Sequence, residues 1–195
     1  MQEVKVGVPI NNLELELYYP KKGEVKKVKT SDFQGKWLVL VFYPADFTFV
    51  CPTELKDLND HSREIKKLGE LIAISTDTVY SHKVFCESEQ LLADLEYPLA
   101  GDANHKISSI FGVLDETSGL ARRGTFIIDP DGVLRAAEIN DFSVGRRGKE
   151  LLRKLKAFDY VRKNPGQVCP ADWEVGKPTI TPSINIAGRV YEVLK

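Results

Sequence analysis

The sequence predicts an α/β fold in which a central mixed sheet is flanked by helices and followed by an extended C-terminal arm. The apolar run at 36–43 has the length and the β-branched and aromatic content of a strand buried on both faces, and segment 70–75 is predicted as a second buried strand. The segment between them, 52–68, carries leucine and isoleucine at helical spacing, with charged residues on the other side. A strand–helix–strand unit of this kind normally pairs its strands in parallel through a right-handed crossover.

The remaining elements follow from local patterns. Strict alternation of apolar and charged residues at 13–17 predicts a strand, and 25–29 is the expected return strand. A second hairpin is expected from strand 124–129, the turn Pro130-Asp131-Gly132 and strand 133–139. Further helices are predicted at 79–95, 104–111 and 146–163. This order of strands and helices is that of a thioredoxin-like fold.

The end of the chain differs from the rest in its proline content and in its lack of periodicity. Prolines stand at 170, 178 and 182, and the segment shows little periodicity. Such a segment has little core of its own and is suited to packing on another subunit. We therefore divide the chain into a thioredoxin-like domain, 1–165, and a C-terminal arm, 166–195.

Composition narrows the class of protein. Lys and Arg number 27 against 28 Asp and Glu, so the chain has no basic field that would favour nucleic acid as a partner. No apolar run approaches the roughly 20 residues that a membrane span needs. The N-terminus lacks the features of a secretion signal, and the three cysteines are an odd number. These observations predict a cytoplasmic protein rather than a secreted disulfide scaffold.

Cys51 stands at the position in the sequence that is best suited to a reactive side chain. It follows the first buried strand by one loop and opens the next helix, with Pro52 suited to the first helical position. The free backbone N–H groups and the dipole of a helix N-terminus stabilise a thiolate relative to a thiol. A small buried hydrophobic residue is the alternative interpretation, and position alone favours neither.

Three motifs decide between these interpretations. Segment 44–51 reads Pro-Ala-Asp-Phe-Thr-Phe-Val-Cys and matches the pattern Pro-x-x-x-Thr-x-x-Cys. Segment 119–130 reads Gly-Leu-Ala-Arg-Arg-Gly-Thr-Phe-Ile-Ile-Asp-Pro, and segment 168–173 reads Val-Cys-Pro-Ala-Asp-Trp. Together they resemble the typical two-cysteine peroxiredoxins. The tail 181–188, Thr-Pro-Ser-Ile-Asn-Ile-Ala-Gly, is similar to the bacterial alkyl hydroperoxide reductase type of that family.

The resemblance implies a thiol-dependent peroxidase that reduces hydrogen peroxide and organic hydroperoxides to water and alcohols in antioxidant defence. Cys51 is then the peroxidatic cysteine, which becomes a sulfenic acid. Cys169 of a partner subunit is the resolving cysteine. Thr48, Pro44 and Arg123 complete the expected catalytic set: a hydroxyl for the peroxide, a shield for the sulfur and a fixed positive charge.

Several residues near these motifs have less specific interpretations. Alternation along the incoming strand sends Arg122 to the opposite face from Arg123, so Arg122 is expected at the surface. Glu54 is expected either to anchor an active-site arginine or to be an exposed carboxylate in the first turn of its helix. Cys86 matches none of the motifs and is expected to be a silent structural thiol. The basic segment 145–149 lacks the spacing of a phosphate loop and is interpreted as a helix start.

The resemblance further implies a homodimer with an intersubunit disulfide, commonly in a decameric ring. Thioredoxin or a flavoprotein disulfide reductase is the expected electron donor, and no cofactor or metal is expected. A thioredoxin-like dithiol oxidoreductase is an alternative, but it would need a second cysteine where Glu54 stands. A redox-linked chaperone is compatible with a peroxidase role. A zinc module built from the cysteines with His61, His82 and His105 lacks closely spaced ligand pairs.

Overall fold

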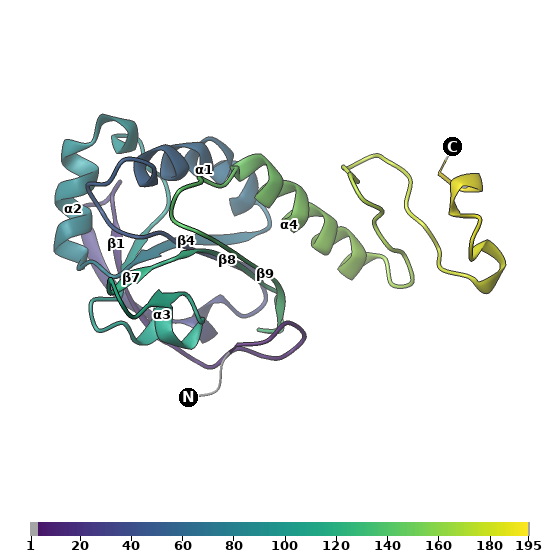
Figure 1. Cartoon of the computed structure of the whole chain (residues 1–195), viewed down its shortest axis with the longest axis horizontal. Coiled ribbons are helices and arrows are strands. Elements are labelled where there is room, and N and C mark those ends of the chain that lie inside the picture. The colour runs from purple at the N-terminus through teal and green to yellow at the C-terminus, as the bar shows by residue number, and fades with distance from the viewer. Residues whose placement is uncertain (1–3, 195) are drawn as a thin grey trace. The chain divides into compact units, whose positions relative to one another are not determined.

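The computed structural model describes residues 4–194. The first three residues, which contribute to the prediction about targeting, and the last residue of the arm lie outside the described residues. The chain forms two compact units, Met1–Gly148 and Lys149–Lys195, which we describe separately. Figure 1 shows the order of the elements along the chain.

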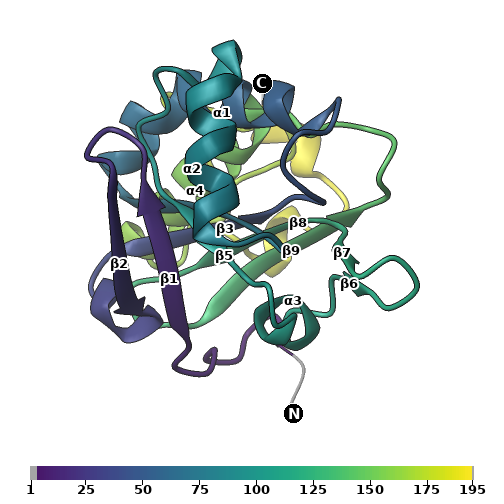
Figure 2. The ribbon, with the colours of Figure 1, turned by 90° about the vertical axis from the view of Figure 1, so that its left-hand side faces the viewer.

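The first unit is built on a mixed seven-stranded sheet with the order β2-β1-β5-β4-β3-β8-β9. The bounds of its strands are β1 Glu14–Tyr19, β2 Glu24–Lys29, β3 Trp37–Phe42, β4 Gly69–Ser75, β5 Leu99–Gly101, β8 Arg123–Ile128 and β9 Leu134–Asn140. Strand β3 pairs in parallel with β4 and antiparallel with β8, and the β1–β2 hairpin forms one edge of the sheet (Figure 2). The predicted mixed sheet, parallel β3–β4 pair and two hairpins are therefore confirmed.

Helices cover both faces of this sheet. Helix α1 (Cys51–Lys66) and helix α2 (Val79–Ser88) lie on one side, and the short helix α3 (Lys106–Ile110) lies on the other (Figure 1). A small second sheet pairs β6 (Leu114–Asp115) with β7 (Leu120–Ala121). Every residue of β3 is buried, as expected for a strand covered on both faces.

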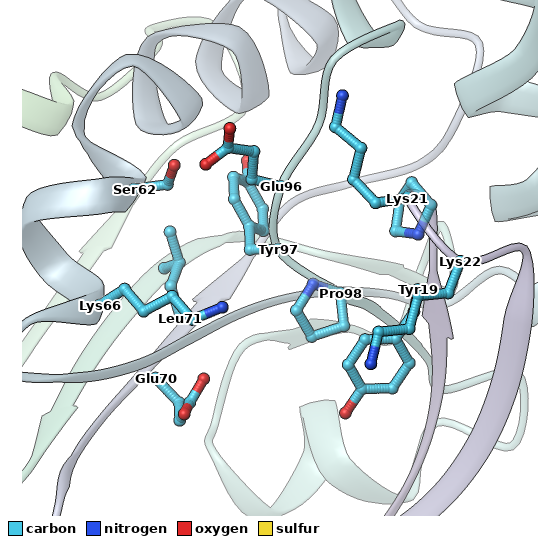
Figure 3. Close-up of a pocket in the computed structure, with 11 residues that line it drawn as sticks. Tyr19, Lys21, Lys22, Ser62, Lys66, Glu70, Leu71, Glu96, Tyr97 and Pro98 are labelled. Carbon is cyan, nitrogen blue, oxygen red and sulfur yellow. The ribbon is translucent and has the colours of Figure 1, made fainter.

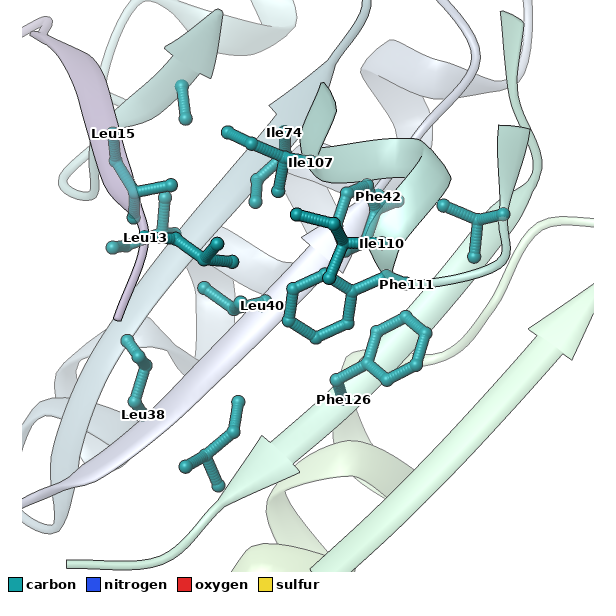
Figure 4. Packing of buried hydrophobic residues seen from close by; sticks show 14 of the residues in the cluster. Leu13, Leu15, Leu38, Leu40, Phe42, Ile74, Ile107, Ile110, Phe111 and Phe126 are labelled. Atoms are coloured by element: carbon teal, nitrogen blue, oxygen red, sulfur yellow. The ribbon is translucent and has the colours of Figure 1, made fainter. Parts of the chain in front are cut away.

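The hydrophobic core on the α3 side is formed by alternate residues of the central strands. Leu38, Leu40 and Phe42 point from β3 toward α3, where Ile110 and Phe111 meet them (Figure 4). The rings of Phe42 and Phe111 lie 5.3 Å apart, at a tilted angle typical of aromatic pairs in cores. This packing fixes β3, and thereby the position at which the chain leaves the sheet toward Cys51.

The second helix is shorter than predicted. Thr78 caps α2 by accepting the backbone N–H of Ser81, but the helix ends at Ser88 and not near residue 95. Glu89 adopts an extended backbone, with φ −88° and ψ 111°, and its carboxylate accepts the N–H of Leu91 to start a separate 3-10 turn, Gln90–Leu92. A local side-chain cap therefore interrupts a run of residues whose composition suits a longer helix.

The register of β3 and β8 sets up the functional site. Val41 pairs with Thr125, so Arg123, which stands two residues before Thr125 at the start of β8, lies beside the end of β3. The loop 43–50 leaves β3 at this point and leads into α1. The beginning of β8 and the beginning of α1 are thus brought to the same edge of the sheet.

The second unit begins within helix α4 (Gly148–Lys163). After the helix, residues 164–194 are mostly irregular. Trp173 folds back toward this helix: its ring lies 5.0 Å from that of Tyr160, and its carbonyl accepts from Arg153 Nη1 at 3.1 Å. An isolated bridge pairs Val168 with Ile180. The predicted division of the chain at residue 165 stays a prediction.

Residues 4–194 contain neither a candidate membrane-spanning helix nor a candidate metal-binding cluster. None of the helices there has the length and apolar character that crossing a bilayer requires. No three His, Cys, Asp or Glu side chains in this range are grouped so that they would hold a metal ion. The zinc-module alternative therefore gains no support.

Candidate active site

Cys51 is the first residue of α1 and is fully buried. Val50 precedes it as the N-cap and supplies no side-chain acceptor, so its carbonyl oxygen begins the helix by accepting the N–H of Glu54 at 3.1 Å. Pro52 stands in the first turn, where its missing N–H costs nothing. The Cys51 thiol is therefore held at the positive end of the helix dipole.

Arg123 brings a positive charge to this sulfur. Its Nη1 lies 3.6 Å from Cys51 Sγ and also donates to Glu54 Oε2, while its Nε donates to the carbonyl of Phe142 at 2.9 Å. Only 3% of Arg123 is exposed. The guanidinium is thus fixed by three partners in a site from which water is largely excluded. Arg122 lies apart from it and pairs with Asp115 at 3.0 Å.

Glu54 joins Arg123 to a second arginine, Arg146. The buried Glu54 carboxylate accepts Arg146 Nε at 2.9 Å and the Arg146 backbone N–H at 2.7 Å. The other guanidinium nitrogens of Arg146 donate to the carbonyls of Phe42 and Gly124. Two guanidinium groups and one carboxylate leave a net charge of +1, which a thiolate at Cys51 would neutralise.

This geometry decides between the two interpretations of Glu54. Glu54 is buried between two arginines, so the expectation of an exposed helix carboxylate is wrong. The basic segment 145–149 contains the start of α4 at Gly148, and within it Arg146 donates its backbone N–H to Glu54. Gly145 leaves room for this approach, because a Cβ there would lie 3.2 Å from Val50 Cγ1 and 3.3 Å from Glu54 Cγ, which is closer than most such contacts.

Pro44 and Thr48 occupy the loop between β3 and α1. Pro44 is buried and Thr48 is half-buried. The hydroxyl of Thr48 donates to the carbonyl of Ala45 at 2.9 Å, which closes the loop on itself. The motif 44–51 therefore forms a compact turn that ends at the buried sulfur.

Comparisons with known proteins identify the family. Residues 6–137 match the model of the AhpC/TSA family. The chain belongs to the AhpC/TSA family. Residues 157–186, which include Cys169, match the C-terminal domain of 1-Cys peroxiredoxin.

Relatives and solved structures of this family agree with the match. Alkyl hydroperoxide reductase C of Staphylococcus epidermidis is 49% identical over 89% of this chain and 92% of its own length. Its counterpart from Staphylococcus aureus is 49% identical over 88% and 91%. The crystal structure of Enterococcus faecalis AhpC has a TM-score of 0.80 and 39% identity, covering 87% of this chain and 100% of that one. The reduced 2-Cys peroxiredoxin of Plasmodium vivax has a TM-score of 0.89 and 29% identity, covering 95% and 98%.

These comparisons confirm the predicted family, the thioredoxin-like fold and the enzyme class of thiol-dependent peroxidase. Within the AhpC/TSA domain, the thiol and the arginine that the motifs single out lie in contact. The sequence motifs did not identify Arg146, which completes the ion-pair network from a position 92 residues beyond Glu54.

The other two thiols have different surroundings. Cys86 lies in α2 and is buried; burial first, then the charges of Asp46 and Glu87, raise its pKa to about 12. Cys169 belongs to the second unit, where its Sγ lies 3.8 Å from the carbonyl oxygen of Ala157. Burial raises the pKa of Cys169, and the charge of Arg153 acts in the opposite direction. All three cysteines are free thiols in the structure.

A cavity of about 450 Å³ lies away from this site. Its walls come from the β1–β2 turn, the end of α1 and the start of β4, and include Tyr19, Lys66 and Tyr97 (Figure 3). No member of the Cys51–Arg123–Glu54 group lines it. This cavity is therefore separate from the thiol site.

Proposed function

We propose that Cys51 is the peroxidatic cysteine and reduces hydrogen peroxide and organic hydroperoxides. The observation that carries this proposal is the 3.6 Å contact between Arg123 Nη1 and Cys51 Sγ at the start of α1. A helix dipole and a buried network of net positive charge both favour the thiolate, which is the nucleophile that peroxide reduction needs.

In the first step the Cys51 thiolate attacks one peroxide oxygen. A sulfur–oxygen bond forms, the oxygen–oxygen bond breaks, and the second oxygen leaves as alkoxide or hydroxide and takes up a proton. Cysteine is oxidised to sulfenic acid while the peroxide is reduced to an alcohol or water. Charge moves from the sulfur onto the leaving oxygen, so fixed donors beside the sulfur stabilise the transition state more than the ground state.

Each neighbour of the thiol has a proposed role in this step. Arg123 stabilises the thiolate and the charge that develops on the peroxide, because its fork of N–H donors is already in place. Glu54 and Arg146 hold that fork in position through their buried ion pairs. Thr48 supplies a hydroxyl for the peroxide, and Pro44 shields the sulfur from water.

The second step consumes the sulfenic acid. The Cys169 thiolate of a partner subunit attacks the oxidised sulfur, a disulfide forms, and hydroxide leaves as water. A disulfide requires Cα atoms within about 7 Å, and Cys51 is buried in the first turn of a helix, so local opening of that turn accompanies the step. A two-electron reductant then restores both thiols; we propose thioredoxin or a flavoprotein disulfide reductase.

The proposal extends to assembly and location. The similarity to 2-Cys peroxiredoxins supports a homodimer with an intersubunit disulfide, and we propose that such dimers assemble further into a decameric ring. Antioxidant defence in the cytoplasm is the proposed setting, in line with free thiols throughout the structure.

Peroxide consumption tests the proposal. The wild-type protein is supplied with dithiothreitol and either hydrogen peroxide or tert-butyl hydroperoxide, and is compared with Cys51→Ser and with the matched control Cys86→Ser. We expect Cys51→Ser to lose at least about a thousandfold in rate, because a serine hydroxyl is not ionised at neutral pH. Cys86→Ser should retain most of the activity. Equal consumption by wild type and Cys51→Ser would contradict the proposal.

A further inference from the structure

A second buried polar cluster lies outside the thiol–arginine network. It consists of Tyr43, Asp46 and His82, and the side chains of Asp46 and His82 have no exposed surface. Burying a carboxylate and an imidazole is costly unless their hydrogen bonds are satisfied. The peroxidase chemistry proposed above uses neither of them, so the presence of this cluster calls for its own explanation.

The cluster ties the loop 43–50 to α2. Asp46 Oδ2 lies 2.9 Å from His82 Nδ1, and Asp46 Oδ1 accepts the hydroxyl of Tyr43 at 2.8 Å. The backbone N–H of Asp46 donates to Asp77 Oδ2 at 2.9 Å, and Asp77 also accepts the hydroxyl of Ser75. The side chain of this loop residue is therefore bound to α2, and its backbone is bound to the segment that joins β4 to α2.

The protonation of this cluster follows from its contacts. Burial, and next the charge of Asp46, hold the pKa of Tyr43 well above its ordinary value, so its hydroxyl stays protonated and donates a hydrogen bond to Asp46. His82 Nε2 is buried and has no hydrogen-bond partner among residues 4–194. A proton on Nε2 would be a buried donor without an acceptor, so we assign the imidazole proton to Nδ1, facing Asp46.

A neighbouring contact holds the same loop at a second point. Phe47 has a φ of +56°, in the left-handed region that a bulky residue seldom adopts. Its ring packs 5.1 Å from that of Phe85, which lies one turn beyond His82 on α2. A strained backbone persists only where its surroundings fix it, and α2 provides that support through His82 and Phe85.

We propose that His82 and Asp46 form a latch that positions the loop 43–50 for the reaction with peroxide. Asp46 stands midway between Pro44 and Thr48, so the latch fixes both flanks of the loop that shapes the site. His82 is thus a positioning residue: it acts through Asp46, and among residues 4–194 its side-chain hydrogen bonds go to Asp46 and Tyr43 rather than to Cys51. This inference rests on the proposed function of Cys51.

The latch and the arginine network predict separable effects. The thiolate at Cys51 is stabilised by the N-terminus of α1 and by Arg123. Among residues 4–194, neither of these forms a side-chain hydrogen bond with His82. Loosening the loop should therefore slow the attack of the thiolate on an aligned peroxide. The reactivity of the thiolate toward a simple alkylating agent should stay unchanged. A misplacement of about 1 Å costs up to roughly a hundredfold in rate.

The test compares His82→Leu, which removes the donor, with His82→Asn, whose amide nitrogen offers a donor close to the position of Nδ1. Oxidation of Cys51 by stoichiometric hydrogen peroxide and its alkylation by iodoacetamide across pH are both followed by quenched-flow mass spectrometry. We expect His82→Leu to react with peroxide about tenfold to a hundredfold more slowly. His82→Asn should recover most of that loss. The pH profile of alkylation should match the wild type in both variants.

Two further variants keep the result interpretable. Val79→Ala truncates a buried residue in the first turn of α2 without touching Asp46, and it should retain the peroxide rate. Tyr43→Phe removes one hydrogen bond to Asp46 and keeps the ring, so it tests the latch if His82→Leu does not fold. A severalfold slower reaction with peroxide is expected for Tyr43→Phe.

The latch is overturned if the His82 variants and Tyr43→Phe react with peroxide like the wild type. It is also overturned if His82→Asn is no better than His82→Leu, or if Val79→Ala loses as much as His82→Leu. Failure of the wild-type Cys51 to react with peroxide at all would instead overturn the proposed function, so the two failures are distinguishable.

Discussion

The three cysteines of this chain share a side chain and differ in what surrounds it. Cys51 faces a guanidinium at a helix N-terminus, and Cys169 lies partly exposed beside Ala157. In α2, burial first and then the charges of Asp46 and Glu87 disfavour the thiolate of Cys86. The chemical character of each thiol is therefore set by its neighbours and not by exposure alone, since Cys51 is as buried as Cys86.

The raised pKa of Cys86 gives a prediction at this scale. A thiol with a pKa of about 12, against an ordinary value of 9.0, stays protonated to higher pH and has about a thousandfold less thiolate at neutral pH. Iodoacetamide labelling of Cys86, followed by peptide mass spectrometry, should rise about tenfold per pH unit between about pH 7 and 10. The urea-unfolded protein serves as the control and should level off near pH 9. Levelling off in the folded protein at that same pH would contradict the account.

The site residues that the sequence could and could not predict differ in a physical way. Cys51 and Arg123 stand in short motifs that can be recognised without knowing the fold, and the structure places them in contact. Arg146, Asp46 and His82 gain their importance only from partners that the folded chain brings to them. Asp46 lies within the predicted motif, yet only the docking of α2 shows that its carboxylate is paired with His82.

At the scale of elements, the site is a meeting of segments that are far apart in sequence. The first turn of α1, the start of β8 and the connection before α4 converge on the Glu54 carboxylate. Arg146 also donates to the carbonyls of Phe42 and Gly124, at the facing ends of β3 and β8. One guanidinium thus clamps three elements around the thiol.

Removing this clamp should affect stability and activity together. Arg146→Leu leaves part of the buried Glu54 charge uncompensated, which is expected to lower the free energy of unfolding by about 3 kcal/mol and the peroxide rate by about tenfold or more. Arg147→Gln is the matched control, since Arg147 is exposed and next in sequence. Urea unfolding and peroxide consumption measure the two effects. An Arg146→Leu protein that behaved like Arg147→Gln would show that the clamp has no role.

The boundaries of elements also show where local patterns stop being sufficient. The run 36–43 predicted β3 closely, because a strand buried on both faces must be continuously apolar. The predicted end of α2 is too late, since Glu89 caps a new turn. A side-chain hydrogen bond sets this boundary, and no periodic pattern records it.

At the scale of the whole molecule, the sheet order brings the reactive thiol and the residues that position its loop to the same edge of the sheet. The central strands β3 and β4 are buried and parallel; the loop after β3 leads to Cys51 at the start of α1, and the loop after β4 carries Asp77. The fold class could be predicted from the order of strands and helices, because each had a clear periodic signal. For the second unit, the sequence motif singles out Cys169, whose proposed role as the resolving cysteine stays a prediction.

The most direct measurement of the central claim is the fate of Cys51 after one turnover. The reduced protein receives one equivalent of hydrogen peroxide, and the products are separated on a non-reducing gel and mapped by mass spectrometry. We predict a covalent dimer joined by Cys51 and Cys169 in the wild type and in Cys86→Ser, and none in Cys51→Ser. The Cys169→Ser protein should remain monomeric on the gel with a Cys51 sulfenic acid that dimedone traps. Unmodified Cys51 in the wild type, or a Cys51-linked dimer in Cys169→Ser, would contradict this account.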